Sequence, residues 1–77
     1  MNSGGIRMLS YKPLFRLLLE RDMSKTQLKN GVSLSPNVMS KLSKGEYVSM
    51  EVIERICKYL NCRIEDVVEI LPDKDGK

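Results

Sequence analysis

Two helix-start signals lie close together near the middle of this 77-residue chain, and they constrain its fold more than any other feature. Ser24 can cap the backbone N–H of Gln27 while the Gln27 side chain reaches back, which is the Ser-x-x-Gln pattern of a capping box. Ser35 is a second N-cap residue, and Pro36 follows at the first helical position, where no N–H is missed. Gly45 is the residue type that ends a helix. This stretch therefore predicts two short helices joined by a tight turn.

The second of these helices has an apolar side and a polar side. Met39 and Leu42 lie three positions apart on its inward side, and Leu28 is the inward anchor of the first helix. The rest of its surface is mostly polar and basic, and consists of Asn37, Val38, Ser40, Lys41 and Lys44. Two capped helices with such an outer face have the shape of a helix-turn-helix, whose second helix enters the major groove of DNA.

The stretch resembles the DNA-binding domain of the XRE family, which contains the Cro protein and the lambda-type phage repressors. The chain matches the motif of that family without a gap at Leu28, Leu34, Ser35, Met39, Leu42 and Gly45. It departs from the motif at Lys29, where alanine is usual, and at Ser33, where the turn glycine is usual. Lys29 must therefore extend outward, and either Ser33 or Gly31 must allow the turn. The likeness to small single-domain members of the family covers residues 11–72.

The remaining segments complete a prediction of five helices. Residues 10–22 have leucines at helical spacing, with Pro13 in the first turn. Ser49 caps a helix with a periodic apolar face that ends at Asn61, and residues 64–71 form a fifth helix. We expect an all-α fold, a compact five-helix bundle of the lambda-repressor-like DNA-binding type that contains the helix-turn-helix. Residues 1–9 are expected to be a flexible leader or tag remnant, residues 10–72 the domain and residues 73–77 a solvated tail.

Composition argues against several classes of function. The chain has no His, so neither a Ser-His-Asp or Cys-His catalytic arrangement nor a His-containing zinc site can be assembled, and we expect no enzyme, cofactor or metal. Cys57 and Cys62 lack further metal ligands, and a disulfide would need an oxidising compartment, so we expect reduced cysteines that pack in the core. The sequence shows neither a membrane-spanning run nor a secretion signal, so we expect a cytoplasmic protein that does not bind membranes.

Charge is unevenly distributed along the chain. Residues 7–47 carry eight basic and three acidic side chains, a net charge of +5, whereas residues 48–77 carry five basic and seven acidic side chains, a net charge of −2. Runs of charge are often only solvated faces, so charge alone does not distinguish such a face from a surface that binds phosphates. Its placement around the helix-turn-helix favours a surface that faces phosphates.

The family resemblance implies a sequence-specific double-stranded DNA-binding transcriptional regulator that acts as a repressor, with residues 36–44 reading the major groove. By position in the family motif, Pro36, Asn37, Ser40 and Lys41 correspond to places that meet bases. Pro36 has no donor, so we expect Asn37, Ser40 and Lys41 to read the bases, with Val38 available to a thymine methyl group. The resemblance also implies phosphate contacts from Lys25, Ser35, Lys44 and Tyr47. We expect a homodimer on DNA that pairs through Ile70 and Leu71, because one small module offers too little base contact. No small-molecule effector is evident.

A second hypothesis is a protein-interaction module, such as an antitoxin-like or phage regulatory partner, in which contact with DNA is secondary. An interaction surface on the second helix of the motif would be apolar, whereas Asn, Ser and Lys dominate that helix. Weak binding to long duplex DNA that did not depend on salt would favour this second hypothesis over the first.

Overall fold

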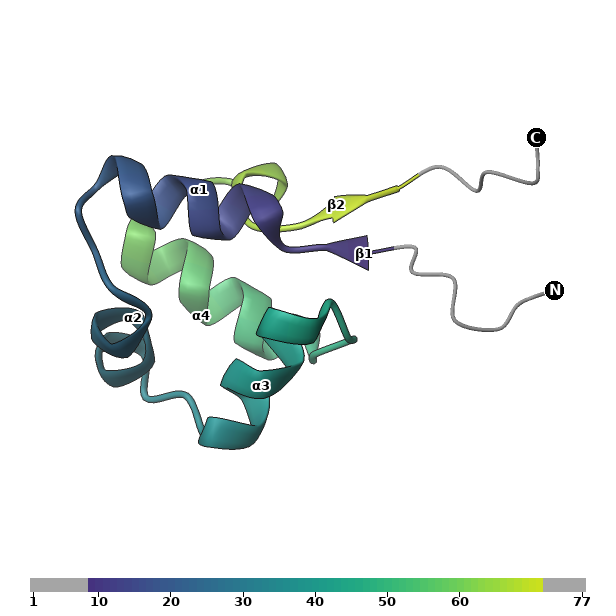
Figure 1. Cartoon of the computed structure of the whole chain (residues 1–77), viewed down its shortest axis with the longest axis horizontal. Coiled ribbons are helices and arrows are strands. Elements are labelled where there is room, and N and C mark those ends of the chain that lie inside the picture. Colours follow the sequence, from purple (N-terminus) through teal and green to yellow (C-terminus); the bar gives the residue numbers. More distant parts are fainter. Residues whose placement is uncertain (1–8, 72–77) are drawn as a thin grey trace, which may run out of the picture.

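A computed structural model describes residues 9–71 of the chain (Figure 1). Its elements are, in chain order, β1 (Leu9–Ser10), α1 (Lys12–Glu20), α2 (Lys25–Val32), α3 (Pro36–Lys44), α4 (Met50–Leu60), the 3-10 turn η1 (Ile64–Asp66) and β2 (Glu69–Ile70). The two short strands pair with each other at the end of the molecule opposite α2 (Figure 1). Among residues 9–71, no helix has both the length and the apolar character needed to cross a lipid bilayer.

Serine caps start three of the helices where the sequence predicts them. The backbone N–H of Gln27 donates to Ser24 Oγ at 3.0 Å, and the Ser24 N–H donates to Gln27 Oε1 at 2.8 Å, so the predicted capping box is confirmed. Ser35 Oγ and Ser49 Oγ each accept a hydrogen bond of 3.2 Å from the backbone N–H three residues later. These short-range bonds satisfy N–H groups that have no partner within the helix.

Residues in the left-handed backbone conformation end the three helices that begin at these caps. Ser33 has φ of 64° and makes the turn between α2 and α3. Gly31 is part of α2, so of the two residues considered for this turn it is Ser33 that makes it. Gly45 (φ 74°) and Asn61 (φ 52°) end α3 and α4 in the same conformation, as predicted.

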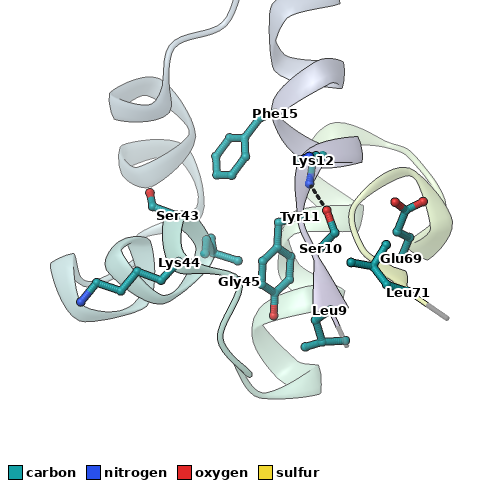
Figure 2. Close-up of a pocket in the computed structure, with 11 residues that line it drawn as sticks. Leu9, Ser10, Tyr11, Lys12, Phe15, Ser43, Lys44, Gly45, Glu69 and Leu71 are labelled. Carbon is teal, nitrogen blue, oxygen red and sulfur yellow. Dashed lines mark hydrogen bonds between the residues drawn. The ribbon is translucent and has the colours of Figure 1, made fainter. Parts of the chain in front are cut away.

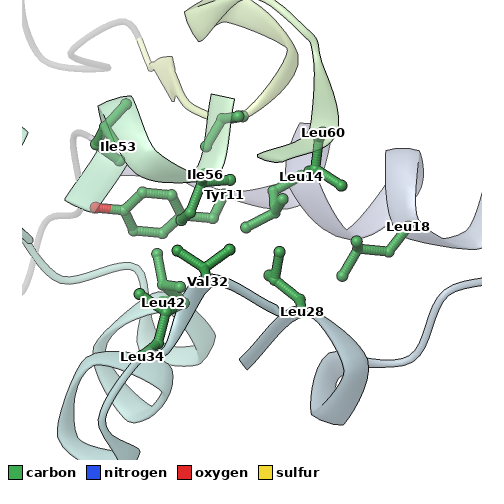
Figure 3. Packing of buried hydrophobic residues seen from close by; sticks show 11 residues of the cluster. Tyr11, Leu14, Leu18, Leu28, Val32, Leu34, Leu42, Ile53, Ile56 and Leu60 are labelled. Atoms are coloured by element: carbon green, nitrogen blue, oxygen red, sulfur yellow. The ribbon is translucent and has the colours of Figure 1, made fainter. Parts of the chain in front are cut away.

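The hydrophobic core lies where the four helices meet (Figure 3). Its fully buried side chains are Leu14, Leu28, Leu42, Ile56, Leu60 and Val67. Each of the four helices contributes at least one of them, so the helix-turn-helix is held as part of a single core. Tyr11 is also buried, and its hydroxyl donates a hydrogen bond of 2.7 Å to the carbonyl of Glu46, which ties the start of α1 to the loop after α3.

The prediction of a five-helix, all-α fold is wrong in the segment after α4, which forms no fifth helix. Residues 64–66 form only the 3-10 turn η1, and β2 pairs antiparallel with β1, so that Leu9 lies opposite Ile70. The described residues therefore form four helices and a small two-stranded sheet. The backbone of Glu69 and Ile70 is extended because it pairs with β1, a partner distant in the sequence that the apolar pattern of residues 64–71 does not reveal.

α1 is shorter at both ends than the predicted helix over residues 10–22. It begins at Lys12 because Ser10 belongs to β1, where the Ser10 hydroxyl accepts a hydrogen bond of 3.2 Å from the Lys12 backbone N–H (Figure 2). It ends at Glu20, and Asp22 adopts a left-handed conformation with φ of 54°. Leu9, predicted to belong to the leader, is thus part of the folded structure. The rest of that leader (residues 1–8) and the predicted tail (residues 73–77) lie outside the described residues.

Cys57 and Cys62 are free thiols that lie half-buried against the core. Burial raises the pKa of both thiols. Within residues 9–71, no three His, Cys, Asp or Glu side chains gather in a way that could hold a metal ion.

Candidate nucleic-acid interface

The outer face of α3 brings together four polar side chains. A helix turns by about 100° per residue, so residues separated by three and four positions share one face. Asn37, Ser40, Lys41 and Lys44 have this spacing and are all exposed, and we call them the α3 stripe. Leu42 lies on the opposite side of the helix and is only 1% exposed. The core therefore anchors α3 in an orientation that turns the stripe outward.

A groove between α2 and α3 borders the α3 stripe. Its walls are formed by Lys25, Thr26, Lys29, Pro36, Met39, Ser40 and Ser43. Ser40 belongs to both the stripe and the groove, so the two features form one continuous surface. Lys25 and Lys29 are one turn apart on α2 and place two ammonium groups along its edge.

The surface formed by α2 and α3 has a single sign of charge. Residues 24–45 contain four lysines and no acidic residue. Acidic side chains gather elsewhere, around a pocket between α1 and the segment that contains η1, where Glu20, Glu65, Asp66 and Glu69 lie. This separation produces a positive field on the helix-turn-helix side, which attracts polyanions such as the phosphate backbone of DNA.

The sequence matches the family of Cro/C1-type HTH DNA-binding domains over residues 14–73. The chain belongs to this family. Among solved structures it is similar to the transcriptional regulator VanUg, with 39% sequence identity and a TM-score of 0.83 over 95% of this chain and 100% of that chain. No protein of curated function matches the chain significantly. The resemblance to XRE-type regulators is thereby confirmed, and the two helices of the family motif are α2 and α3.

As a Cro/C1-type domain, the chain presents three of its four predicted base-reading residues on one surface. Asn37, Ser40 and Lys41 lie together on the α3 stripe. Val38 does not, because it is half-buried and packs against the hydrophobic core. Its position is about 100° around α3 from Asn37, at the edge of the stripe.

The predicted phosphate-contacting residues lie at the start of α2, at both ends of α3 and in the loop after α3. Lys25 Nζ lies 4.7 Å from the centroid of the Phe15 ring, a cation–π geometry that holds the ammonium at the start of α2. Lys44 is in the last turn of α3, and Figure 2 shows its ammonium directed away from the nearby pocket. Tyr47 is 73% exposed in the following loop. Ser35 Oγ accepts the capping bond from Val38, which leaves its hydroxyl proton free to donate.

Two residues on the α2 wall of the groove were not predicted as interface residues. Thr26 and Lys29 line it together with Lys25, although the sequence analysis considered Lys29 only as a departure from the family motif. A signal was present in the sequence, because Lys29 follows Lys25 by four residues and must share its face of α2. Thr26 carried no comparable signal.

Proposed function

We propose that this Cro/C1-type protein is a transcriptional regulator that binds specific double-stranded DNA sequences through α3 in the major groove, and that it acts as a repressor. The observation that carries this proposal is the α3 stripe, an exposed row of polar side chains on a helix whose other side is locked into the core. Membership of a DNA-binding family and the similarity to a transcriptional regulator support it.

The chemistry of the α3 stripe matches the edges of base pairs. The Asn37 amide can pair with adenine through one donor and one acceptor, and the Lys41 ammonium can donate to the O6 and N7 atoms of guanine. The Ser40 hydroxyl can either donate or accept. Val38, at the edge of the stripe, is the apolar side chain available to a thymine methyl group.

Contacts to phosphates would set the register of α3 in the groove. We assign this role to Lys44, at the C-terminal end of the stripe, and to Lys25, Ser35 and Tyr47, which lie outside it. Such contacts add affinity without sequence information, so they act alike on every duplex. Thr26 and Lys29 extend the same surface along α2.

Repression would follow from occupancy, because a protein seated on a promoter blocks RNA polymerase. We further propose that two copies bind two half-sites about one helical turn apart. Ile70 is 76% exposed in β2 and is the apolar side chain we assign to the pairing surface, with the half-buried Leu71 beside it. The pairing surface is therefore a strand and not the end of a fifth helix.

Selection of bound duplexes from a random pool tests the proposal. We expect a recovered motif with an inverted repeat, and weaker binding to a scrambled duplex. Asn37→Ala and Lys41→Ala should each lower affinity for the selected duplex by roughly 1 to 3 kcal/mol and hardly change affinity for the scrambled one. Lys58→Ala is the matched control, because Lys58 is an exposed lysine of α4 that pairs with Glu54 at 3.1 Å.

Two results would contradict the proposal. Equal loss of affinity for both duplexes in Asn37→Ala and Lys41→Ala would mean that α3 does not read sequence. A selection that recovers no motif, together with weak and salt-insensitive binding, would favour the protein-interaction module instead.

A further inference from the structure

Two side chains of α4 hold the end of α2 immediately before the turn that leads into α3. The Arg55 guanidinium donates a hydrogen bond to the carbonyl of Val32, the last residue of α2. One turn along α4, the Tyr59 ring covers Gly31, where a Cβ atom would lie only 2.2 Å from Tyr59 Cζ. Arg55 and Tyr59 are four residues apart, so they act from the same face of α4.

The end of α2 is the part of the helix-turn-helix that most needs such support. The last carbonyls of a helix have no partner within the helix, so the Arg55 guanidinium satisfies a group that would otherwise depend on water. Ser33 follows directly in the left-handed conformation, which is unfavourable for a residue other than glycine. Arg55 therefore stabilises the backbone next to a strained turn.

The Tyr59 contact lies on the side of α2 that faces away from the groove between α2 and α3. Lys29 lines the groove between α2 and α3, and Gly31 follows it by two residues, which is about 200° around the helix. The contact of Arg55 is with the α2 carbonyl that directly precedes the turn into α3, so Arg55 acts on α3 through that turn. A role for Arg55 in binding would be one of positioning and not of contact.

We propose that Arg55 is a positioning residue for sequence reading: its bond to the Val32 carbonyl sets the angle between α2 and α3 and so aligns Asn37 and Lys41 with the base edges. This inference rests on the function proposed above. Hydrogen bonds to base edges tolerate displacements of only about half an ångström, so a small rotation of α3 would affect both residues together. Contacts to phosphates made by long lysine side chains would adapt to the same rotation.

The test compares Arg55→Met, Arg55→Lys and the control Lys58→Met in the full chain. Each variant is titrated against the selected duplex and the scrambled duplex at several salt concentrations, at a temperature where circular dichroism shows it folded. For Arg55→Met we expect about tenfold weaker binding to the selected duplex, less than about twofold change on the scrambled duplex, and an unchanged salt dependence. Arg55→Lys should recover part of the loss, because an ammonium can still donate to one carbonyl, and Lys58→Met should change neither affinity.

Each alternative result has its own signature. Equal loss on both duplexes with a smaller salt dependence would mean that Arg55 contacts a phosphate, and would overturn the inference. A folded Arg55→Met protein with full discrimination would also overturn it, because Arg55 would then contribute to stability alone. If the unsubstituted protein itself fails to discriminate between the duplexes, the proposed function fails before any variant is measured, and the inference falls with it.

Discussion

The phenol ring of Tyr59 lies directly against the backbone of Gly31. A Cβ atom at position 31 would lie 2.2 Å from Tyr59 Cζ and 2.3 Å from Tyr59 Oη, far closer than real Cβ atoms approach other heavy atoms. Gly31 is helical, so it is not required for a left-handed turn. Its role is to let α2 and α4 approach each other closely.

Gly31→Ala should therefore destabilise the protein although alanine is the better helix former. We expect a loss of up to about 1 kcal/mol in the free energy of unfolding, because the contacting atoms are the outer end of the 46% exposed Tyr59 ring, which must turn away from α2. In a Tyr59→Ala background the same change should become stabilising, by up to about 1 kcal/mol, because only helix propensity remains. Urea denaturation of the four proteins measures this reversal of sign. An equal effect in both backgrounds would show that the ring does not limit the approach.

Ser33→Gly should stabilise the protein by about 1 kcal/mol, because Ser33 has φ of 64° and glycine adopts this conformation without strain. Asn61→Gly is the matched control at the end of α4, where φ is 52°. Asparagine tolerates the left-handed region better than serine, so this second gain should be smaller. Thermal unfolding of both variants gives the comparison. A lower melting temperature in Ser33→Gly would contradict the account of the turn.

Tyr11 should make the protein sensitive to alkaline pH. Burial raises the pKa of Tyr11 above its ordinary value of 10.0, although a hydrogen bond from the Val48 backbone opposes the shift. The folded state therefore holds the phenol proton more tightly than the unfolded chain. This contribution to stability is complete below about pH 10 and is lost as the pH rises through the folded pKa. Burial also raises the pKa of Cys57 and of Cys62 above the ordinary thiol value of 9.0, so both thiols likewise lower the stability of the protein as the pH rises.

Tyr11→Phe isolates the contribution of the phenol. At neutral pH it should cost about 1 kcal/mol, because the hydrogen bond to the Glu46 carbonyl is lost. Above pH 10 its stability should fall less steeply than that of the unsubstituted protein. Urea midpoints between pH 7 and about 11 provide the measurement. Parallel curves for the two proteins throughout this range would argue against a buried, titrating Tyr11.

Lys25→Ala and Lys44→Ala should weaken binding to the selected and scrambled duplexes by the same factor. If each ammonium meets one phosphate, the slope of log affinity against log salt should fall by about one for each lysine removed. Lys58→Ala serves as the control lysine outside the interface. A loss confined to the selected duplex would assign these lysines to base reading instead.

Prediction from the sequence succeeded where short-range chemistry decides the structure. The Ser24–Gln27 capping box and the left-handed stop at Gly45 each involve residues within about one helical turn, so the residues themselves define both boundaries. The exposed position of Asn37 and Lys41 followed in the same way from the spacing of inward residues on α3. These residues were enough to indicate the family and the face of α3 that carries the candidate site.

Tertiary structure decided what depends on partners distant in the sequence. Residues 64–71 have an apolar pattern that suits a helix, but β2 forms because its backbone pairs with β1 at the other end of the described chain. The contacts of Arg55 with Val32 and of Tyr59 with Gly31 exist only because α4 packs across the end of α2. Helical periodicity shows which face of a helix turns inward. Which residue of a neighbouring helix contacts that face is determined by how the side chains pack in the assembled core.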